Sequence, residues 1–381
     1  MKVLIAVDSF KGSISSSEAS KAIALGIRDV YSYAEMITLP LADGGEGTVE
    51  ALVQATEGQF IEKEVMGPLQ EKVQAVYGIL GDKKTAVIES AAACGLPLIP
   101  LDKRNPSVTT TYGLGELIRD AIEKGCREFV IGLGGSATND AGIGMLQALG
   151  YRFLNECNEE VGLGGRELHK IQKIHMAHAI PELKSCTFHV ACDVNNPLYG
   201  PSGAAYIFGP QKGATAEMVK ELDKGLESFA QEVFNELGID IHSIEGAGAA
   251  GGLGAAFAGF LEARLQSGVE LILEMTKMEE IMQGADLVIT GEGQLDGQTS
   301  MGKAPLGVAQ LAQKYHIPVL ALAGSITPEA ERLNRLGVTS YFSIVNTPMT
   351  LEEAMDSNTA FNNIRATTKQ LFRLLQALNK G

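Results

Sequence analysis

Two patterns of apolar residues alternate at both ends of the chain. Short continuous apolar runs predict strands that are buried in a parallel sheet, whereas apolar residues three or four positions apart predict helices. Near the N-terminus this pair of patterns occurs twice. The predicted strands are Lys2–Val7 and Glu35–Leu41, and the predicted helices are Thr48–Ala55 and one that begins at the capping box Ser15–Glu18.

The same alternation returns toward the C-terminus. The predicted strands are Asp286–Thr290, Pro318–Ala323 and Ser340–Val345, and the predicted helices are Leu306–Tyr315, Glu329–Leu336 and one helix or a pair of helices over Leu351–Leu378. Five apolar strands that alternate with helices are typical of a doubly wound parallel sheet with helices on both faces. The sequence therefore predicts an α/β fold.

The middle of the chain follows a different pattern. Phe60–Val65, Lys72–Leu80 and Thr85–Glu89 are short strand-like runs separated by turn signals, and they predict a local meander. A helix over Leu114–Glu123 and a strand over Phe129–Leu133 are expected next. We therefore predict that residues 1–58 plus 246–381 form one α/β domain, into which residues 59–245 are inserted as a second. The return boundary is expected between residues 245 and 285.

Composition and charge exclude several classes of partner. The chain has 31 Lys and Arg against 46 Asp and Glu, and its net charge of −15 disfavours nucleic acids and anionic membranes. It has no apolar run of about 18 residues, and its first apolar stretch is too short for a signal peptide, so we expect a cytoplasmic protein. The 5 cysteines are scattered without a C-x-x-C motif, which argues against a disulfide framework or a zinc site.

Three predicted strand ends combine acids and glycines, two of them with a lysine close by. These segments are Asp8 to Gly12, Asp43-Gly44-Gly45-Glu46, and Gly291 to Asp296 with Glu292 inside it. Ligands of open parallel sheets bind at the carboxyl ends of the strands, and glycines let backbone N–H groups approach an anion. Acids beside an anion site indicate a metal or a general base, so the combination favours a phosphate with Mg²⁺. The alternative is that Asp8 and Asp43 are turn or N-cap residues.

Gly297–Ala304, GQTSMGKA, is close to the phosphate-binding motif G-x-x-x-x-G-K-[ST]. Ala304 replaces the hydroxyl that would bind Mg²⁺, so a working motif of this kind is not expected. Lys303 is then either a phosphate-facing lysine whose metal is held by acids elsewhere, or part of an ordinary loop before a helix with Pro305 in its first turn.

The sequence leaves two interpretations open for each of two further polar residues, Lys212 and Asp193. Lys212 lies between the turn residues of Gly209–Gly213, where it is either solvated or bound to an anion. Asp193 follows the strand-like run Thr187–Ala191, where a catalytic or metal-binding carboxylate would lie, but an Asx turn explains it equally well.

The stretch Phe129–Gly144, FVIGLGGSATNDAGIG, contains a formal match to the dinucleotide motif G-x-G-x-x-A. Asp140 would then face a pyrophosphate, which is unfavourable. The backbone of Gly134 and Gly135, together with polar side chains, suits the phosphate chain of ATP better; those side chains are Ser136, Thr138 and Asn139. An NAD-dependent oxidoreductase acting on a small hydroxy acid is the alternative. Asp140 faces the metal or caps the helix behind it.

An ordered series of motifs resembles the type-I family of bacterial glycerate kinases. The motifs are IAVDSFKGS, LADGGEGT, IGLGGSATNDAGIG, VACDVNNPL, IFGPQKGA, GAGAAGGLGAA and VITGEGQLD followed by GKAPLGVA. The resemblance implies ATP- and Mg²⁺-dependent phosphorylation of D-glycerate, with 2-phosphoglycerate favoured over 3-phosphoglycerate, in organic-acid metabolism. It also implies a flavodoxin-like domain with an inserted, swivelling β/α domain and an active site in the cleft between them. The chain departs from the family pattern at Val7, where Pro is common, and at Gln294-Leu295, where Arg-Ile is common.

This reaction class suggests a role for each candidate. Lys11 and Lys303 would neutralise charge, and Lys11 and Lys212 would bind the carboxylate of glycerate. Asp193 or Asp296 would deprotonate the hydroxyl, and Mg²⁺ would be held by Asp43, Glu292 or Asp296. The ATP phosphates would lie on Gly134, Gly135, Ser136, Thr138 and Asn139, with Gly44 and Gly45 as a further glycine loop. A non-enzymatic regulator is a third hypothesis, which the absence of a basic helix-turn-helix segment disfavours.

Overall fold

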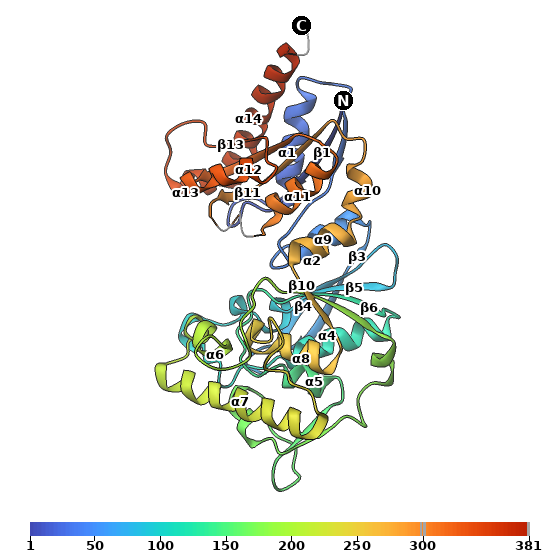
Figure 1. The fold of residues 1–381 in the computed structure, drawn as a ribbon, viewed down its shortest axis with the longest axis vertical. Helices are drawn as coiled ribbons and strands as arrows, with labels where there is room; N and C mark the ends of the chain where they lie inside the picture. The colour runs from blue at the N-terminus through green and yellow to red at the C-terminus, as the bar shows by residue number, and fades with distance from the viewer. Residues whose placement is uncertain (298, 300–301, 379–381) are drawn as a thin grey trace. The chain divides into compact units, whose positions relative to one another are not determined.

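The chain divides into two compact units in the computed structural model, which describes residues 1–297, 299 and 302–378 (Figure 1). Unit 1 comprises Met1–Asp43, Glu50–Ala55 and the segment from Val269 onward, and unit 2 comprises Gly44–Val49 and Thr56–Gly268. The chain thus returns to unit 1 at Val269.

Unit 1 is built on five parallel strands in the order β2-β1-β11-β12-β13. The strands are β1 (Lys2–Val7), β2 (Glu35–Thr38), β11 (Leu287–Leu295), β12 (Val319–Ile326) and β13 (Ser340–Ser343). Numbered within the unit, this order is 2-1-3-4-5, the flavodoxin-like arrangement. The predicted doubly wound parallel sheet is confirmed.

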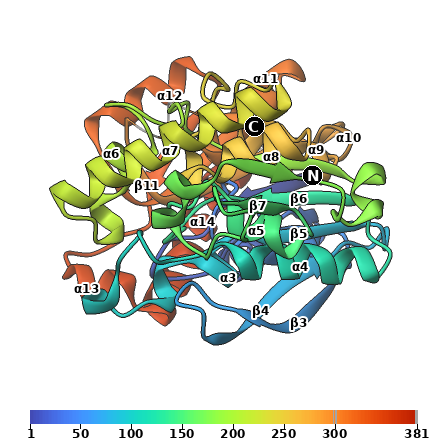
Figure 2. The same cartoon turned by 90° about the horizontal axis from the view of Figure 1, so that it is seen from below.

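Helices cover both faces of this sheet (Figure 1), and Figure 2 shows the same ribbon from below. On one face, Val3, Ile5 and Val7 of β1 share a buried core with α1 (Ser16–Arg28) and α14 (Ser357–Leu378). The other helices of the unit are α2 (Thr48–Ala55, shared between the units), α9 (Gly268–Met275), α10 (Met278–Met282), α11 (Ala304–Lys314), α12 (Arg332–Arg335) and α13 (Leu351–Met355). Since α11 packs against β11, β1 and β12, the central strands are buried on both sides.

Some predicted boundaries differ from the observed ones. β11 runs to Leu295 instead of ending at Thr290, because the glycine-rich end keeps the ladder with β12, where Gln294 lies opposite Ser325. The helix predicted over Glu329–Leu336 is a 3₁₀ turn, Pro328–Glu331, followed by the short α12. The capping box is confirmed: Glu18 N–H donates to the Ser15 hydroxyl, and the Glu18 carboxylate accepts from the Ser15 N–H.

Unit 2 contains a mixed six-stranded sheet in the order β10-β9-β6-β5-β4-β3 and a separate β7-β8 pair. The strands are β3 (Gln59–Met66), β4 (Lys72–Ile79), β5 (Thr85–Glu89), β6 (Glu128–Gly132), β7 (Arg152–Leu154), β8 (Lys173–His175), β9 (Thr187–Ala191) and β10 (Arg264–Gln266). β3, β4 and β5 are antiparallel neighbours, which confirms the predicted meander, and β5, β6, β9 and β10 are parallel.

The helices of unit 2 include one long helix that the sequence analysis did not single out. They are α3 (Ala91–Cys94), α4 (Tyr112–Glu123), α5 (Ile143–Ala148), α6 (Ala204–Phe208), α7 (Ala216–Leu237) and α8 (Leu253–Phe260). The Thr215 hydroxyl accepts from the Met218 N–H at the start of α7, and Gly238 ends the helix with a φ of 72°. None of the described helices is both long and apolar enough to cross a lipid bilayer.

The packing of α1 on α14 yields a stability prediction. A Cβ on Gly26 would lie 2.7 Å from the Arg365 carbonyl oxygen and 2.8 Å from Thr368 Cβ. Alanine favours a helix by about 1 kcal/mol over glycine, but overpacking costs about 1–3 kcal/mol. We expect Gly26→Ala to lower the free energy of unfolding of unit 1 by about 1–2 kcal/mol, measured by hydrogen exchange in α1 and α14.

The matched control is Gly225→Ala in α7. A Cβ there would lie at an ordinary contact distance of 3.4 Å from Leu168 Cβ. This variant should be neutral or stabilise unit 2 by up to about 1 kcal/mol, because only the helix propensity changes. Equal stabilisation by both substitutions would show that α1 and α14 can separate without cost.

Candidate active site

The order of strands in unit 1 creates a switch point between β1 and β11. From β1 the chain continues to β2 on one side, and the later strands β11, β12 and β13 lie on the other. Open α/β sheets bind ligands in the crevice at the carboxyl ends of the strands at such a point. Val7 lies opposite Gly291, so the residues that follow each of them, Asp8 and Glu292, come from neighbouring strands at this edge.

Asp8 is held directly at the end of β1 and is only 2% exposed. Its N–H donates to the Gly291 carbonyl at 2.9 Å, and its Oδ1 accepts from the Ser9 N–H at 2.5 Å. Burial raises the pKa of Asp8 to about 7, and the charge of Asp43 adds to this, while the Ser9 hydrogen bond and Lys11 oppose it. The carboxyl is therefore partly protonated at neutral pH.

Lys11 and Asp43 form an ion pair beside Asp8. The Lys11 Nζ donates to Asp43 Oδ2 at 2.7 Å, and the lysine is the more exposed of the two. Burial would lower the pKa of Lys11, but the hydrogen bond and charge of Asp43 outweigh it and raise the pKa. The structure thus brings together Lys11 and Asp43, which the sequence places 32 residues apart.

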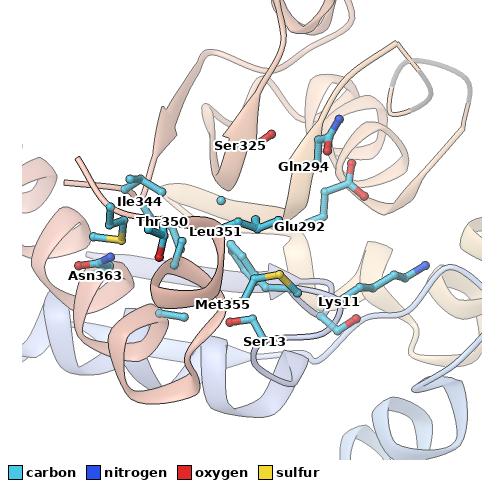
Figure 3. Close-up of a pocket in the computed structure, with 18 of the residues that line it drawn as sticks. Lys11, Ser13, Glu292, Gln294, Ser325, Ile344, Thr350, Leu351, Met355 and Asn363 are labelled. Carbon is cyan, nitrogen blue, oxygen red and sulfur yellow. The ribbon is translucent and has the colours of Figure 1, made fainter. Parts of the chain in front are cut away.

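Glu292, which Figure 3 shows, is buried, and a hydroxyl and a lysine lie beside its carboxylate. Thr299 Oγ1 donates to Glu292 Oε1 at 2.5 Å, and Lys303 Nζ lies 3.7 Å from Oε2. Burial raises the pKa of Glu292; Thr299 and Lys303 oppose the rise, whereas the charges of Asp296 and Asp43 add to it. Glu292 is therefore close enough to the other acids to be affected by their charges.

Asp296 and Lys303 flank the segment that resembles a phosphate-binding loop. Asp296 Oδ1 accepts from the Thr299 N–H at 3.1 Å, and Gln294 Nε2 donates to Asp296 Oδ2 at 3.2 Å. Lys303 is the N-cap residue of α11, which begins with Ala304 and Pro305. Three residues of the motif, Gln298, Ser300 and Met301, lie outside the described residues.

The acids of unit 1 suit a Mg²⁺ ion that is shared with a phosphate. Within residues 1–297, 299 and 302–378, no three His, Cys, Asp or Glu side chains gather closely enough to hold a metal by themselves. Mg²⁺ usually keeps several waters and binds through one or two carboxylates plus substrate phosphates, so a complete cage is not required. The charges of Asp43 and Glu292 disfavour ionisation of Asp8, and those of Asp296 and Asp43 disfavour ionisation of Glu292. A divalent cation would relieve this repulsion.

In unit 2, the backbone of the loop at Gly44-Gly45 packs against the backbone of Gly132 and Gly134. Gly44 has a φ of 85°, and a Cβ there would lie 2.6 Å from Ala191 Cβ. A Cβ on Gly132 would lie 2.6 Å from the Gly44 carbonyl oxygen, and one on Gly134 would lie 3.1 Å from Gly45 Cα. The close approach accounts for Gly44 and Gly132, while Gly134 and Gly135 are exposed and can present their backbone to an anion.

The polar side chains that follow these glycines are buried. Ser136 is 5% exposed and Asn139 is 0% exposed, with neither Asn139 side-chain atom hydrogen-bonded. Lys212, 2% exposed, donates from Nζ to Ser136 Oγ at 3.1 Å and to the Thr138 carbonyl at 2.7 Å. Burial lowers the pKa of Lys212 to about 8, although Cys94 and Asp140 oppose the shift. Lys212 is thus not solvated, and it supports the glycine loop from inside the unit.

Asp140 joins two helices of unit 2. Its Oδ2 accepts from the Thr111 N–H and hydroxyl, both at 2.9 Å, and its Oδ1 accepts from the Gly142 N–H at 3.1 Å. Thr111 is the N-cap residue of α4, and Gly142 is the N-cap residue of α5. Burial raises the pKa of Asp140, and these hydrogen bonds oppose the rise. Of the two predicted roles, the geometry supports the helix-end role.

The match to the dinucleotide motif does not have the geometry of a dinucleotide site. In that site the glycine turn opens directly into a helix. Here Gly132 ends β6, Ser136 forms a bridge to Gly95, and α5 begins only at Ile143. The G-x-G-x-x-A match is therefore accidental.

Asp193 lies just beyond β9, at the carboxyl end of the parallel part of the unit 2 sheet. Its side chain is exposed, and its Oδ1 accepts from the Gly268 N–H at 3.0 Å. The hydrogen bond fixes the carboxylate at the edge of the sheet, so its position suits either a base or a structural turn.

The sequence analysis named Asp8 only as one of several acids at a candidate anion site, and it gave Thr299 no role. Asp8 was equally consistent with a turn, and only its position after the central strand β1 signals a buried carboxyl. Thr299 is a polar residue in a loop motif, and nothing in the sequence indicates that its hydroxyl donates to Glu292 seven residues earlier.

Comparisons with known proteins agree with this arrangement of loops. The model of the Glycerate kinase family matches residues 3–376. Glycerate kinase of Bacillus subtilis (strain 168) is 50% identical over 356 residues, 93% of each chain. Glycerate 2-kinase of Escherichia coli (strain K12) is 47% identical over 371 residues, 97% of each chain.

A solved structure is similar over its full length. The crystal structure of a Salmonella typhimurium LT2 protein described as glycerate kinase 2 superimposes with a TM-score of 0.92 at 44% identity, and 100% of each chain is covered. Fold, loops and sequence agree from end to end, and the chain belongs to the glycerate kinase family.

Proposed function

We propose that this protein transfers the γ-phosphoryl group of ATP to D-glycerate with Mg²⁺, giving 2-phosphoglycerate in preference to 3-phosphoglycerate, in organic-acid metabolism. The observation that carries the proposal is the group of buried acids at the switch point of unit 1, with Lys11 and Lys303 beside them. Family membership supports the reaction, and the 47% identity to the Escherichia coli glycerate 2-kinase supports the position of transfer.

Phosphoryl transfer depends mostly on positioning and on neutralising charge, so the residues of unit 1 have natural roles. Lys11 and Lys303 would contact phosphate oxygens, and Glu292 with Asp43 or Asp296 would hold Mg²⁺. Bound Mg²⁺ would neutralise the negative charge that develops on the transferred group. Thr299 orients the Glu292 carboxylate by its hydrogen bond.

The residues of unit 2 would bind and activate the small anionic groups. The exposed backbone of Gly134 and Gly135 would bind phosphate oxygens, with Ser136, Thr138 and Asn139 beneath it. Because Lys212 is buried on Ser136, it would contribute positive charge to that loop and to the carboxylate of glycerate. Asp193, or Asp296 of unit 1, would accept the proton of the attacking hydroxyl.

A coupled assay tests the proposal. The protein is incubated with ATP, Mg²⁺ and D-glycerate, and the product is passed to enolase without a phosphoglycerate mutase. Formation of phosphoenolpyruvate would support transfer to the 2-hydroxyl. Release of ADP without that signal would contradict 2-phosphoglycerate as product, and no D-glycerate-dependent ADP release would reject the kinase.

Neutralising either candidate base should separate its role from a structural one. We expect kcat to fall about 10²–10⁴-fold in whichever of Asp193→Asn and Asp296→Asn removes the base. The thermal stability of both variants should change little. Asp223→Asn is the matched control, because Asp223 also accepts a backbone N–H, that of Gly200 at 2.8 Å. Near-normal kcat in both variants would remove these two acids from the mechanism.

The raised pKa of Asp8 predicts how stability depends on pH. Its pKa is about 7 in the folded protein against 3.8 ordinarily, so its ionisation lowers the free energy of unfolding as pH rises from about 4 to 7. In metal-free buffer, Asp8→Asn should raise the free energy of unfolding at pH 8, by at most about 4 kcal/mol, and the gain should shrink toward pH 4.

The same experiment reports on Mg²⁺. Millimolar Mg²⁺ should raise the melting temperature of the unsubstituted protein more at pH 8 than at pH 5, because it binds the ionised acids. Asp286→Asn is the control, since Asp286 lies at the opposite end of β11 and its side chain is 63% exposed. A gain for Asp8→Asn that does not vary with pH would exclude ionisation of Asp8 as its cause.

A further inference from the structure

Unit 1 contains a cavity of about 500 Å³ at the carboxyl ends of its strands (Figure 3). Its walls come from the loop after β1, the ends of β11 and β12, the segment after β13, and helices α13 and α14. A crevice at the ends of parallel strands is the usual ligand position in this fold. The catalytic roles proposed above use only the edge of this cavity that carries Lys11, Glu292 and Lys303.

The two ends of the cavity differ in chemistry. Figure 3 shows Lys11, Glu292 and Gln294 on one side, and Thr350 and Asn363 on the opposite side. Apolar side chains also line the cavity, among them Phe10, Ile344, Leu351 and Met355, and Figure 3 shows Leu351 and Met355 between the two ends. A matching ligand therefore has a charged end, an apolar body and a hydrogen-bonding edge at the far end.

The volume of the cavity suits one of the two proposed substrates, ATP, better than the other, D-glycerate. Ligand cavities of about 300–1,000 Å³ hold molecules the size of a nucleoside, and a three-carbon acid would fill a small part of 500 Å³. An acid has no apolar body for the middle of the cavity. An adenosine has a flat apolar ring system, whose edge carries a donor and acceptors.

The Asn363 amide suits the edge of adenine. An asparagine side chain offers an acceptor oxygen and two N–H donors, and it pairs with adenine through two hydrogen bonds, to N6 and N7. Asn363 lies on α14, which Ile364 and Phe372 anchor in the core of unit 1, so its backbone is held rigidly. Met355 on α13 lies against the Gly12 turn, where a Cβ would be 2.7 Å from Met355 Cε.

We infer that this cavity is the nucleoside pocket of the ATP site, with adenine in the apolar middle and its edge on Asn363. The inference rests on the proposed kinase function and assigns its nucleotide selectivity to α13 and α14. The phosphates then leave the pocket at the end that carries Lys11 and Lys303, where Glu292 is also present. The cavity thus places the charged part of ATP beside the residues proposed to neutralise it.

The test is a pair of substitutions at the far end and in the middle of the cavity. Asn363→Ala should raise the KM for ATP by about tenfold or more and reduce the preference for ATP over GTP, with kcat and the KM for D-glycerate within about twofold. Met355→Trp, which fills the middle of the cavity, should weaken ADP binding by a similar factor in calorimetry without D-glycerate. Asn362→Ala is the matched control, because Asn362 is exposed and adjacent on the same helix.

The possible outcomes separate the two proposals. An unsubstituted protein that releases no ADP with D-glycerate would overturn the proposed function and this inference with it. An active protein whose KM for ATP and ADP affinity are unchanged in both variants would overturn the inference alone. A rise in the KM for D-glycerate without one for ATP would also overturn it, because the cavity would then belong to the acid. Circular dichroism of both variants checks that their fold is intact.

Discussion

Burial of several carboxyl groups at one sheet edge is the constraint on which unit 1 depends. An isolated buried carboxylate is strongly unfavourable, and Asp8 and Glu292 are 2% and 6% exposed. The raised pKa of Asp8 lowers this cost because the carboxyl is less often charged. At Glu292 the cost is lowered by the Thr299 hydroxyl and the Lys303 ammonium group. Such an arrangement is most stable with a cation present, which connects the energetics of the fold to chemistry that uses a metal and a phosphate.

The topology of the sheet makes this gathering possible. β1 and β11 are separated by about 280 residues, yet they are neighbours in the sheet, with Val7 opposite Gly291. All of unit 2 lies between β2 and the return of the chain at Val269, in the two segments Gly44–Val49 and Thr56–Gly268. The insertion therefore leaves the order of the parallel strands intact, and the switch point remains at the centre of unit 1.

Much of the fold could be predicted because local signals agree with the packing. Lys2–Val7 is a continuous apolar run and becomes the central strand, and Thr48–Ala55 is a helix at the predicted residues. The site was less predictable, since burial of polar groups is a tertiary effect. Nothing near Lys212 indicates that it turns inward to Ser136, and Asn363 belongs to an ordinary amphipathic helix. The motifs pointed to loops at the ends of strands, but they did not indicate which side chains the fold would bury.

Because unit 1 is built from separate parts of the sequence, its folding must wait for the C-terminal part of the chain to be synthesised. β1 is buried only when β11 lies beside it, and β11 is made about 280 residues later. At about 5–20 residues per second, β1 and α1 wait on the order of 15–55 s for this partner. All residues of unit 2 are synthesised within that interval. The inserted unit is therefore the first that can complete its core, and β1 lacks one of its two neighbours in the sheet until synthesis nears its end.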